Sequence, residues 1–134
     1  MGQVGVRWTV RCYVSPQGVD EIHRWYENQP PAVQAKFVSR LQALICSPAH
    51  EWKLPLFRWL HGECAGLGEI RFKADVQQRP LGFCTPGHVF TLVLCAVEKG
   101  GKLVPKEACA IGLRRKEEVN SDASRAVAFW IRPE

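Results

Sequence analysis

The stretch that decides the fold runs from Gly66 to Lys116, and it opens with the residues Gly66-Leu67-Gly68-Glu69-Ile70-Arg71-Phe72-Lys73. From Ile70 to Asp75, apolar side chains alternate with charged ones, which is the period of a half-buried strand. The segment from Val89 to Val97 is almost continuously apolar, as expected of a central strand that is covered on both faces. This stretch therefore predicts a sheet with Val89–Val97 at its centre.

The residues before this stretch predict one strand and two helices. Alternation from Val6 to Val14 predicts a first strand, and Ser15-Pro16 is expected to start a helix, since serine caps helices and proline suits their first turn. Pro30-Pro31 ends that helix and begins a second one, whose apolar residues keep helical spacing through Cys46. Two helices joined by a tight turn predict a helical hairpin that packs on the sheet.

The remaining segments predict further strands and one more helix. Residues Trp52 to His61 favour an edge strand, because Pro55 has no N–H to donate to a neighbouring strand. A turn is predicted at Gln77-Gln78, and Arg79 then leads the next strand. The last helix is expected to begin near Pro105 and to run to about residue 119.

These elements indicate the fold class α+β. The predicted order is an N-terminal strand, a two-helix hairpin, an antiparallel meander sheet and a C-terminal helix, with the helices on one side of the sheet. Residues 1–120 form one domain in this interpretation. Residues 121–134 form a C-terminal extension, which is expected to be a further strand or a docking arm because it carries the apolar segment 126–131.

Composition narrows the class of protein. A chain of 134 residues with 46% hydrophobic and 23% charged residues fits one folded domain with a core. The longest apolar run is too short for a membrane-spanning helix, and no apolar leader precedes Val6, so we expect a cytoplasmic protein without a membrane partner. No cysteine lies in a C-x-x-C pair or has a histidine at zinc-ligand spacing. We therefore expect six free thiols, no metal and no cofactor.

Positive charge is concentrated in the second half of the chain. Between Arg71 and Lys116 there are nine Lys and Arg residues against three acidic ones, whereas the whole chain carries a net charge of +5. The rest of the chain is therefore nearly neutral. A cationic face on a small sheet predicts a phosphate-rich partner.

The order of elements and the short motifs within them resemble the RelE/ParE toxin superfamily, and are most similar to its phage-derived, HigB-like branch. The resemblance covers roughly residues 6–119. It rests on a Gly-Leu-x-Glu-Ile-Arg strand, an arginine-led strand, an apolar strand, a Lys-x-x-Lys pair, and a proline that opens the last helix. It implies a bacterial toxin that a cognate antitoxin neutralises, either as a homodimer or in a toxin–antitoxin hetero-oligomer.

In the nuclease branches, the resemblance implies an endoribonuclease that enters the ribosome and cuts mRNA without a metal. The ribose 2′-hydroxyl attacks the neighbouring phosphate, and positive side chains stabilise the charge of the transition state. Carried over by motif, the catalytic residues are Arg71, Arg79, Lys99, Lys102 and Glu69. The residues expected to bind RNA are Lys73, Lys106, Arg114, Arg115 and Lys116.

Other interpretations of these residues stay open. Arg71 and Lys73 also fit the solvated face of a strand, and the basic triplet at 114–116 fits a solvated helix face. His61 and His88 are further candidates for an acid–base group. Two alternative functions use the same predicted fold, namely a ParE-like toxin that binds DNA gyrase and a catalytically silent prophage module that binds RNA or protein.

Overall fold

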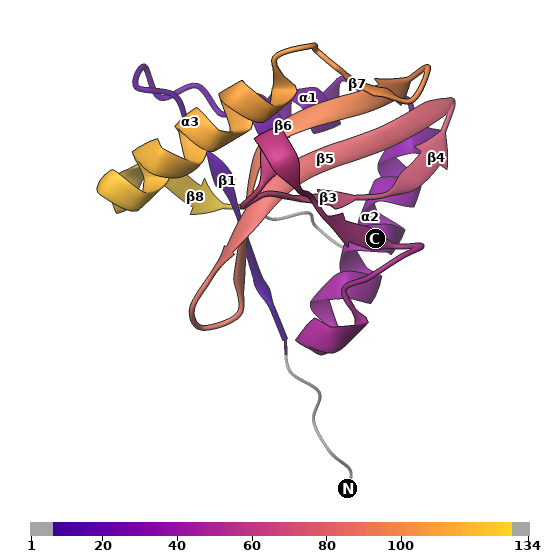
Figure 1. Cartoon of the computed structure of the whole chain (residues 1–134), viewed down its shortest axis with the longest axis horizontal. Helices are drawn as coiled ribbons and strands as arrows, with labels where there is room; N and C mark the ends of the chain where they lie inside the picture. The colour runs from indigo at the N-terminus through magenta and orange to yellow at the C-terminus, as the bar shows by residue number, and fades with distance from the viewer. Residues whose placement is uncertain (1–6, 130–134) are drawn as a thin grey trace, which may run out of the picture.

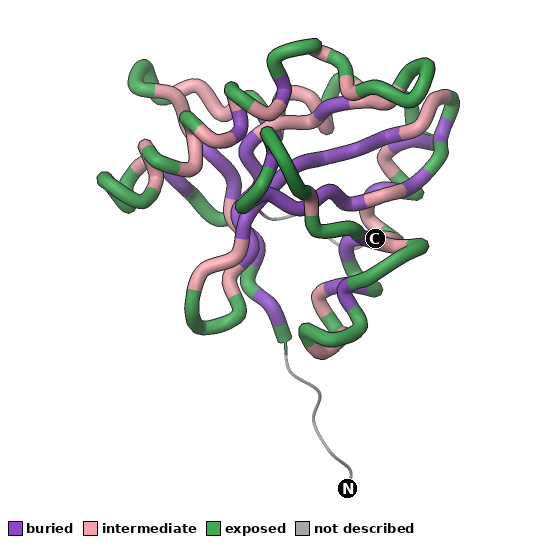
Figure 2. Tube along the Cα trace, in the orientation of Figure 1, coloured by how far each residue is buried: buried purple, intermediate pink, exposed green. Residues whose placement is uncertain are grey.

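Two long neighbouring strands, β5 (Val76–Thr85) and β6 (Val89–Lys99), form the centre of the fold in the computed structural model, which describes residues 7–129. In the turn that joins them, Gly87 and His88 have positive φ angles of 89° and 61°. The middle of both strands is buried, whereas the turns at their ends are exposed (Figure 2). The predicted central strand is confirmed.

The described residues form a mixed α+β fold with three α-helices and an eight-stranded sheet, shown in Figure 1. The sheet order is β2-β3-β5-β6-β1-β8, while β4 pairs with β5 and β7 pairs with β6. The other elements, in chain order, are β1 (Thr9–Tyr13), α1 (Glu21–Glu27), α2 (Pro31–Ile45), η1 (Ala49–Glu51), β2 (Phe57–Trp59), η2 (Gly62–Cys64), β3 (Gly68–Ile70), β4 (Phe72–Ala74), β7 (Lys102–Val104), α3 (Ala108–Ser121), η3 (Ala123–Arg125) and β8 (Ala126–Ala128). Across the described residues, every helix is too short or too polar to span a bilayer.

One strand pair runs parallel, so the expectation of an antiparallel sheet is wrong for that pair. β1 lies alongside β6 in parallel, with Thr9 opposite Val89 and Cys12 opposite Leu92. The other pairs of the described sheet are antiparallel. Apolar alternation has the same period of two in either orientation. The direction of a pairing between segments so distant in sequence was therefore not readable from the pattern.

The helices cover both faces of the sheet, whereas one covered side was expected. On one face, α2 packs Val33, Phe37, Leu41 and Leu44 against a cluster that includes Phe90. On the other face, α3 covers a second apolar cluster, which consists of Tyr13, Leu67, Leu81, Phe83, Val93, Ala96 and Ala108. The physical reason is that β5 and β6 carry apolar side chains on both faces, and the two-helix hairpin can cover only one of them.

The first helix begins later than predicted. α1 starts at Glu21, and the Asp20 carboxylate caps it by accepting the backbone N–H of His23 at 2.9 Å. Ser15 does not cap the helix, because its hydroxyl accepts the backbone N–H of Val19 at 3.0 Å and closes a turn. The second helix follows the prediction, since Pro31 occupies its first turn and it ends at Ile45.

The predicted strand from Ile70 to Asp75 is interrupted, and the predicted turn at Gln77-Gln78 is wrong. β3 ends at Ile70 and β4 begins at Phe72. The chain reverses at Asp75, which has a φ of 71°, and Gln77 and Gln78 then pair with β4 inside β5. Aspartate tolerates positive φ better than most residues. The reversal therefore needs no glycine, and the sequence carried only a weak signal for it.

A disulfide joins Cys64 in η2 to Cys109 in α3, so the expectation of six free thiols is wrong. The remaining cysteines, Cys12, Cys46, Cys84 and Cys95, are free. The two bonded residues are 45 positions apart in the sequence. They meet because α3 returns over η2 on its face of the sheet, and nothing in their local sequence marks this pairing.

We predict that removing this disulfide destabilises the fold. A Cys64→Ala/Cys109→Ala double variant is expected to lose about 2–4 kcal/mol of unfolding free energy, because the bond restricts a long loop of the unfolded chain. Denaturant unfolding of oxidised protein measures the loss, and Cys46→Ala is the matched control at an exposed free thiol. Six reactive thiols in the unfolded, unreduced protein would show that the bond is not formed.

The C-terminal segment docks on β1. β8 pairs antiparallel with β1, with Cys12 opposite Val127. Arg125 donates to the hydroxyl of Tyr13 at 2.9 Å and contacts the carboxylate of Glu118, which also accepts the Tyr13 hydroxyl proton at 2.5 Å. These contacts tie the segment to both β1 and α3. The last two residues of the apolar segment expected at 126–131 lie outside the described part of the chain, as does Val6.

Acidification is expected to weaken this attachment. The hydrogen bond from Tyr13, together with the positive charge of Arg125, lowers the pKa of Glu118. The stabilisation is therefore present above the pKa of about 4.3 of an unfolded glutamate, and it is lost as the pH falls through the lower folded-state value. At about pH 6 the urea midpoint of the wild type should exceed that of Glu118→Gln, and at about pH 3 this difference should be lost. A wild type that keeps its advantage over Glu118→Gln at the acidic pH would contradict this expectation. An equally large advantage over Glu117→Gln, which alters an exposed carboxylate, would also contradict it.

Candidate functional site

A row of alternating charges crosses four neighbouring strands on the α3 face of the sheet. It runs from Arg58 on β2 to Glu69 on β3, then to Arg79 on β5 and Glu98 on β6. Successive members are 3.2, 4.0 and 2.9 Å apart between charged atoms. We call these residues, together with Arg71, the charge ladder.

Glu69 is the centre of the charge ladder. Its side chain is 1% exposed, and one carboxylate oxygen is shared by Arg58, Arg71 and Arg79. Arg71 follows two positions later and therefore lies on the same face, as expected from the period of a strand. A buried carboxylate is tolerated only where positive charge and hydrogen bonds compensate its lost hydration. The three arginines supply that compensation.

Arg79 is held almost entirely by the protein. Its side chain is 4% exposed, and its Nε donates to Glu98 at 2.9 Å. One terminal nitrogen donates to the carbonyl of Gln78 at 2.8 Å and the other to the side-chain oxygen of Gln77 at 3.2 Å. Every nitrogen of this guanidinium thus has an internal acceptor. Three of its five N–H groups are therefore engaged, and the buried side chain offers a phosphate little exposed surface.

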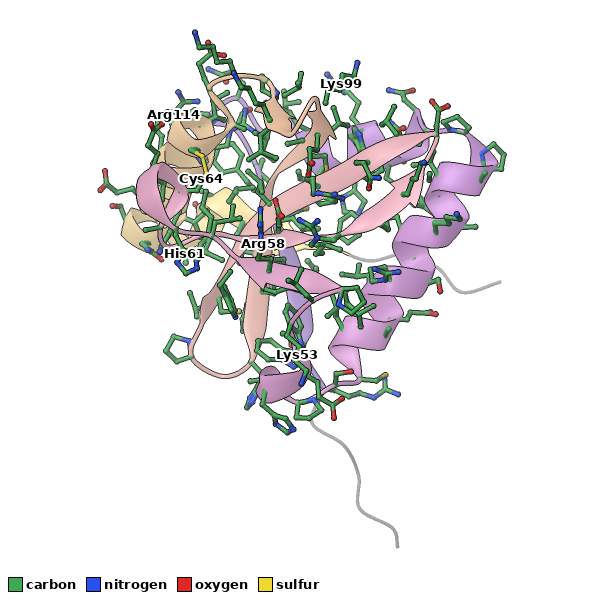
Figure 3. The ribbon with its side chains drawn as sticks, turned by 45° about the vertical axis from the view of Figure 1, so that its right-hand side comes forward. Lys53, Arg58, His61, Cys64, Lys99 and Arg114 are labelled. Carbon is green, nitrogen blue, oxygen red and sulfur yellow. A yellow bond between two sulfur atoms is a disulfide. The ribbon has the colours of Figure 1, made fainter. Side chains whose placement is uncertain are left out.

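A pocket of about 340 Å³ opens beside the charge ladder. The residues that line it come from the β2–η2 segment, the ladder and the β6–β7 hairpin, and they are Arg58, Trp59, Leu60, His61, Cys64, Glu69, Glu98, Gly101 and Leu103. Arg58 and His61 lie on the same side of the sheet in Figure 3. The pocket therefore combines an exposed imidazole with a guanidinium, which are the groups that phosphate chemistry uses.

A second hollow, of about 430 Å³, lies on the edge between the ladder and α2. Its charged lining residues are all basic, namely Arg40, Arg71, Lys73 and Arg79. Arg40 contacts the carbonyl of Arg71, and Lys36 donates to the carbonyl of Lys73 at 3.0 Å. Two basic side chains of α2 thus extend the cationic surface around Lys73.

The other predicted basic residues are not brought together on one face. Lys99 and Lys102 are opposite each other in the β6–β7 hairpin and exposed, at the end of the sheet away from Lys53 in Figure 3. Lys106 is exposed just before α3. Arg114 is exposed on α3 near Glu118, while Lys116 donates to the carbonyl of Gly66 at 3.1 Å. The predicted cationic face is therefore divided among the ladder, a hairpin tip and a helix.

Arg115 occupies a structural position inside the fold. Strand β6 bulges opposite Leu81 and Gly82, and the carbonyl of Val93 at the bulge accepts a hydrogen bond from Arg115 at 2.9 Å. Its guanidinium also lies 4.7 Å from the ring centre of Tyr13 and pairs with Glu21 at 3.1 Å. With a side chain only 11% exposed, Arg115 offers little surface to a nucleic acid.

Sequence reasoning missed Arg58, Arg40 and the placement of His61. Arg58 lies in a short edge strand without clear alternation, and Arg40 lies on the polar side of a helix, where solvated arginines are common. His88 packs edge-on against Trp8 at 4.9 Å outside the two pockets. The contribution of Arg58 becomes visible only through the pairing of β2 with β3, which places Arg58 opposite Glu69.

Three of the four free thiols do not suit nucleophilic catalysis. Burial raises the pKa of Cys84 to about 11, and burial is also the main cause that raises the pKa of Cys12 and of Cys95. A neutral thiol is a poor nucleophile. Within the ladder, Glu69 and Glu98 are each paired with arginine, which offsets their negative charge. A separate group of metal-ligating side chains, Cys12, Asp20 and His23, lies at the end of β1.

Comparison with protein-family models, with curated proteins and with solved structures finds no match to this chain.

Replacing Glu69 should test the electrostatic role of the ladder. Glu69→Gln keeps the volume but leaves three arginines around a neutral group, so we expect the unfolding free energy to fall by about 3–5 kcal/mol. The matched control Glu63→Gln alters an exposed carboxylate in η2 and should change it by less than about 0.5 kcal/mol. Urea unfolding measures both variants. Equal unfolding free energies of Glu69→Gln and Glu63→Gln would show that the three arginines do not need the negative charge of Glu69.

Proposed function

We propose that this protein is the toxin of a type II toxin–antitoxin pair and that it cleaves mRNA on the ribosome without a metal. The observation that carries the proposal is the convergence of three arginines on one buried carboxylate, beside a pocket lined by a histidine. A prearranged guanidinium stabilises developing phosphate charge at little reorganisation cost. The resemblance to the nuclease branches of the RelE/ParE superfamily supplies the substrate class.

The proposed reaction is an attack of the ribose 2′-hydroxyl on the adjacent phosphate. The 2′-oxygen–phosphorus bond forms, the bond to the 5′-oxygen breaks, and a 2′,3′-cyclic phosphate and a 5′-hydroxyl result. His61 takes the proton of the 2′-hydroxyl, and a solvent proton neutralises the leaving oxygen. Arg58 stabilises the extra negative charge, since it lines the same pocket as His61 and keeps part of its surface exposed. Arg71 contacts the same Glu69 carboxylate and adds positive charge from the second hollow.

Glu69 and Arg79 act as positioning residues in this scheme. Glu69 fixes the guanidinium groups of Arg58 and Arg71, while Glu98 and the two glutamines hold Arg79. Lys99 and Lys102 extend from the hairpin whose residues Gly101 and Leu103 border the first pocket. They would contact the phosphates that flank the cleaved one, where a point charge is sufficient.

Partner contacts are supported by exposed apolar side chains beside both pockets. Leu54 is 57% exposed next to the second hollow, and Trp59 is 42% exposed next to the first. Exposed aromatic side chains are common anchors in protein interfaces. An antitoxin that covers these residues would close both pockets. We also propose a cytoplasmic location, since the ribosome is there, although a disulfide is more typical of oxidising compartments.

The test is controlled expression in growing bacteria with mapping of transcript 5′ ends. We expect wild-type protein to cleave within translated frames, and His61→Gln and Arg58→Ala each to reduce cleavage by about 10²–10⁴-fold. The matched controls are His50→Gln, an exposed histidine of η1, and Arg24→Ala, an exposed arginine of α1. Cleavage that survives in His61→Gln and fails in the controls would overturn the assignment of these roles.

A second candidate function is target binding without cleavage, as in ParE-like toxins. The observation in its favour is that all nitrogens of Arg79 have internal acceptors while Trp59 is exposed beside the ladder. Growth arrest with intact transcripts and inhibited DNA supercoiling would select this function. Under it, Trp59→Ala should abolish the arrest and His61→Gln should not.

A further inference from the structure

Three side chains with different metal-ligating atoms converge where β1 leads into α1. Cys12 belongs to β1, Asp20 caps α1, and His23 lies in the first turn of that helix. The sulfur of Cys12 is 3.5 and 3.6 Å from the two oxygens of Asp20 and 3.7 Å from Nδ1 of His23. Nδ1 of His23 is 2.6 Å from Oδ2 of Asp20. Sulfur, nitrogen and oxygen thus surround one point.

These separations match those between the ligands of a tetrahedral zinc ion. Zinc–sulfur bonds of about 2.3 Å and zinc–nitrogen or zinc–oxygen bonds of about 2.0 Å place sulfur about 3.5 Å from each other ligand atom. The two observed sulfur separations are close to this value. The nitrogen–oxygen pair is closer, as a hydrogen bond requires, and it needs to open by less than about 1 Å.

Helix capping explains only part of this cluster. Oδ1 of Asp20 accepts the backbone N–H of His23 and so completes the cap. Capping needs neither the imidazole nor the thiol. Thiolate, imidazole and carboxylate are all metal ligands, so a bound cation would account for the meeting of all three side chains.

We propose that Cys12, Asp20 and His23 bind a zinc ion, with a water molecule as the fourth ligand. A thiolate together with an imidazole favours zinc over magnesium and calcium, which prefer oxygen ligands. On binding, the thiol proton passes to solvent, and Nδ1 of His23 gives up its hydrogen so that the ligand is a neutral imidazole with its proton on Nε2. Cys12 is buried, whereas the other two side chains are about a quarter exposed, so an ion enters from the side of α1.

The site is distinct from the proposed cleavage site. It lies on β1 and α1, while the charge ladder lies on β2, β3, β5 and β6. The ring of His23 packs 4.6 Å from that of Phe129, whose backbone N–H donates to β1. Zinc would therefore fix the start of α1 and, through this contact, the segment after β8. The proposal concerns stability and does not depend on nuclease activity.

The test is cobalt titration of the purified, oxidised full-length protein. Cobalt replaces zinc in tetrahedral sites and shows a sulfur-to-metal charge-transfer band in the near ultraviolet when a thiolate is bound. We expect one equivalent to bind with this band and zinc to displace it. His23→Gln should weaken binding by more than about tenfold. Zinc should also raise the thermal midpoint of the wild type and not that of His23→Gln.

Two further variants make the result specific. Cys12→Val fills the buried position and should abolish the charge-transfer band, whereas Cys95→Ala removes a half-buried thiol outside the cluster and should keep it. Asp20→Asn retains a good capping residue and should weaken binding without loss of α1. A folded wild type that binds no stoichiometric cobalt would overturn the proposal. So would binding that persists in His23→Gln or lacks the sulfur band.

Discussion

The buried carboxylate of Glu69 is the interaction on which the functional face depends. It lies within the sheet with almost no exposed surface, and it is contacted by three arginines, from β2, from β5 and from the link between β3 and β4. Burying one charge without partners would cost several kcal/mol, so the arginines and the carboxylate can exist here only as a group. This requirement holds Arg58 at the pocket that His61 lines, and it holds Arg71 at the second, basic hollow.

The charge ladder occupies a place that the hydrophobic core leaves open. α3 covers the part of its face that carries Leu81, Phe83 and Val93, and the ladder begins where that cover ends. The same strands therefore contribute to the core at one end and to a polar, concave surface at the other. The disulfide between η2 and α3 holds the border between these two regions.

The two proposed sites use different chemistry in different parts of the sheet. Guanidinium groups and an imidazole suit an anion, whereas the thiol, imidazole and carboxylate of Cys12, His23 and Asp20 suit a soft cation. The anion site opens toward solvent on the outer strands β2 and β3. The cation site lies where β1 meets α1 and is mostly buried, which suits an ion that stabilises the fold.

The sequence by itself determined the local elements: the central strand Val89–Val97, the second helix with its proline start, and the neighbourhood of Glu69 and Arg71. Each follows from periodicity or from residue chemistry within a few positions, so it needs no knowledge of distant contacts. Tertiary structure alone decided the parallel pairing of β1 with β6, the cover of both sheet faces, and the Cys64–Cys109 bond. Strand alternation carries no direction, and residues far apart in the chain meet only after the sheet has formed. For the same reason, the sequence alone did not place Arg58 and His61 at the site. Their positions follow from the pairing of β2 with β3.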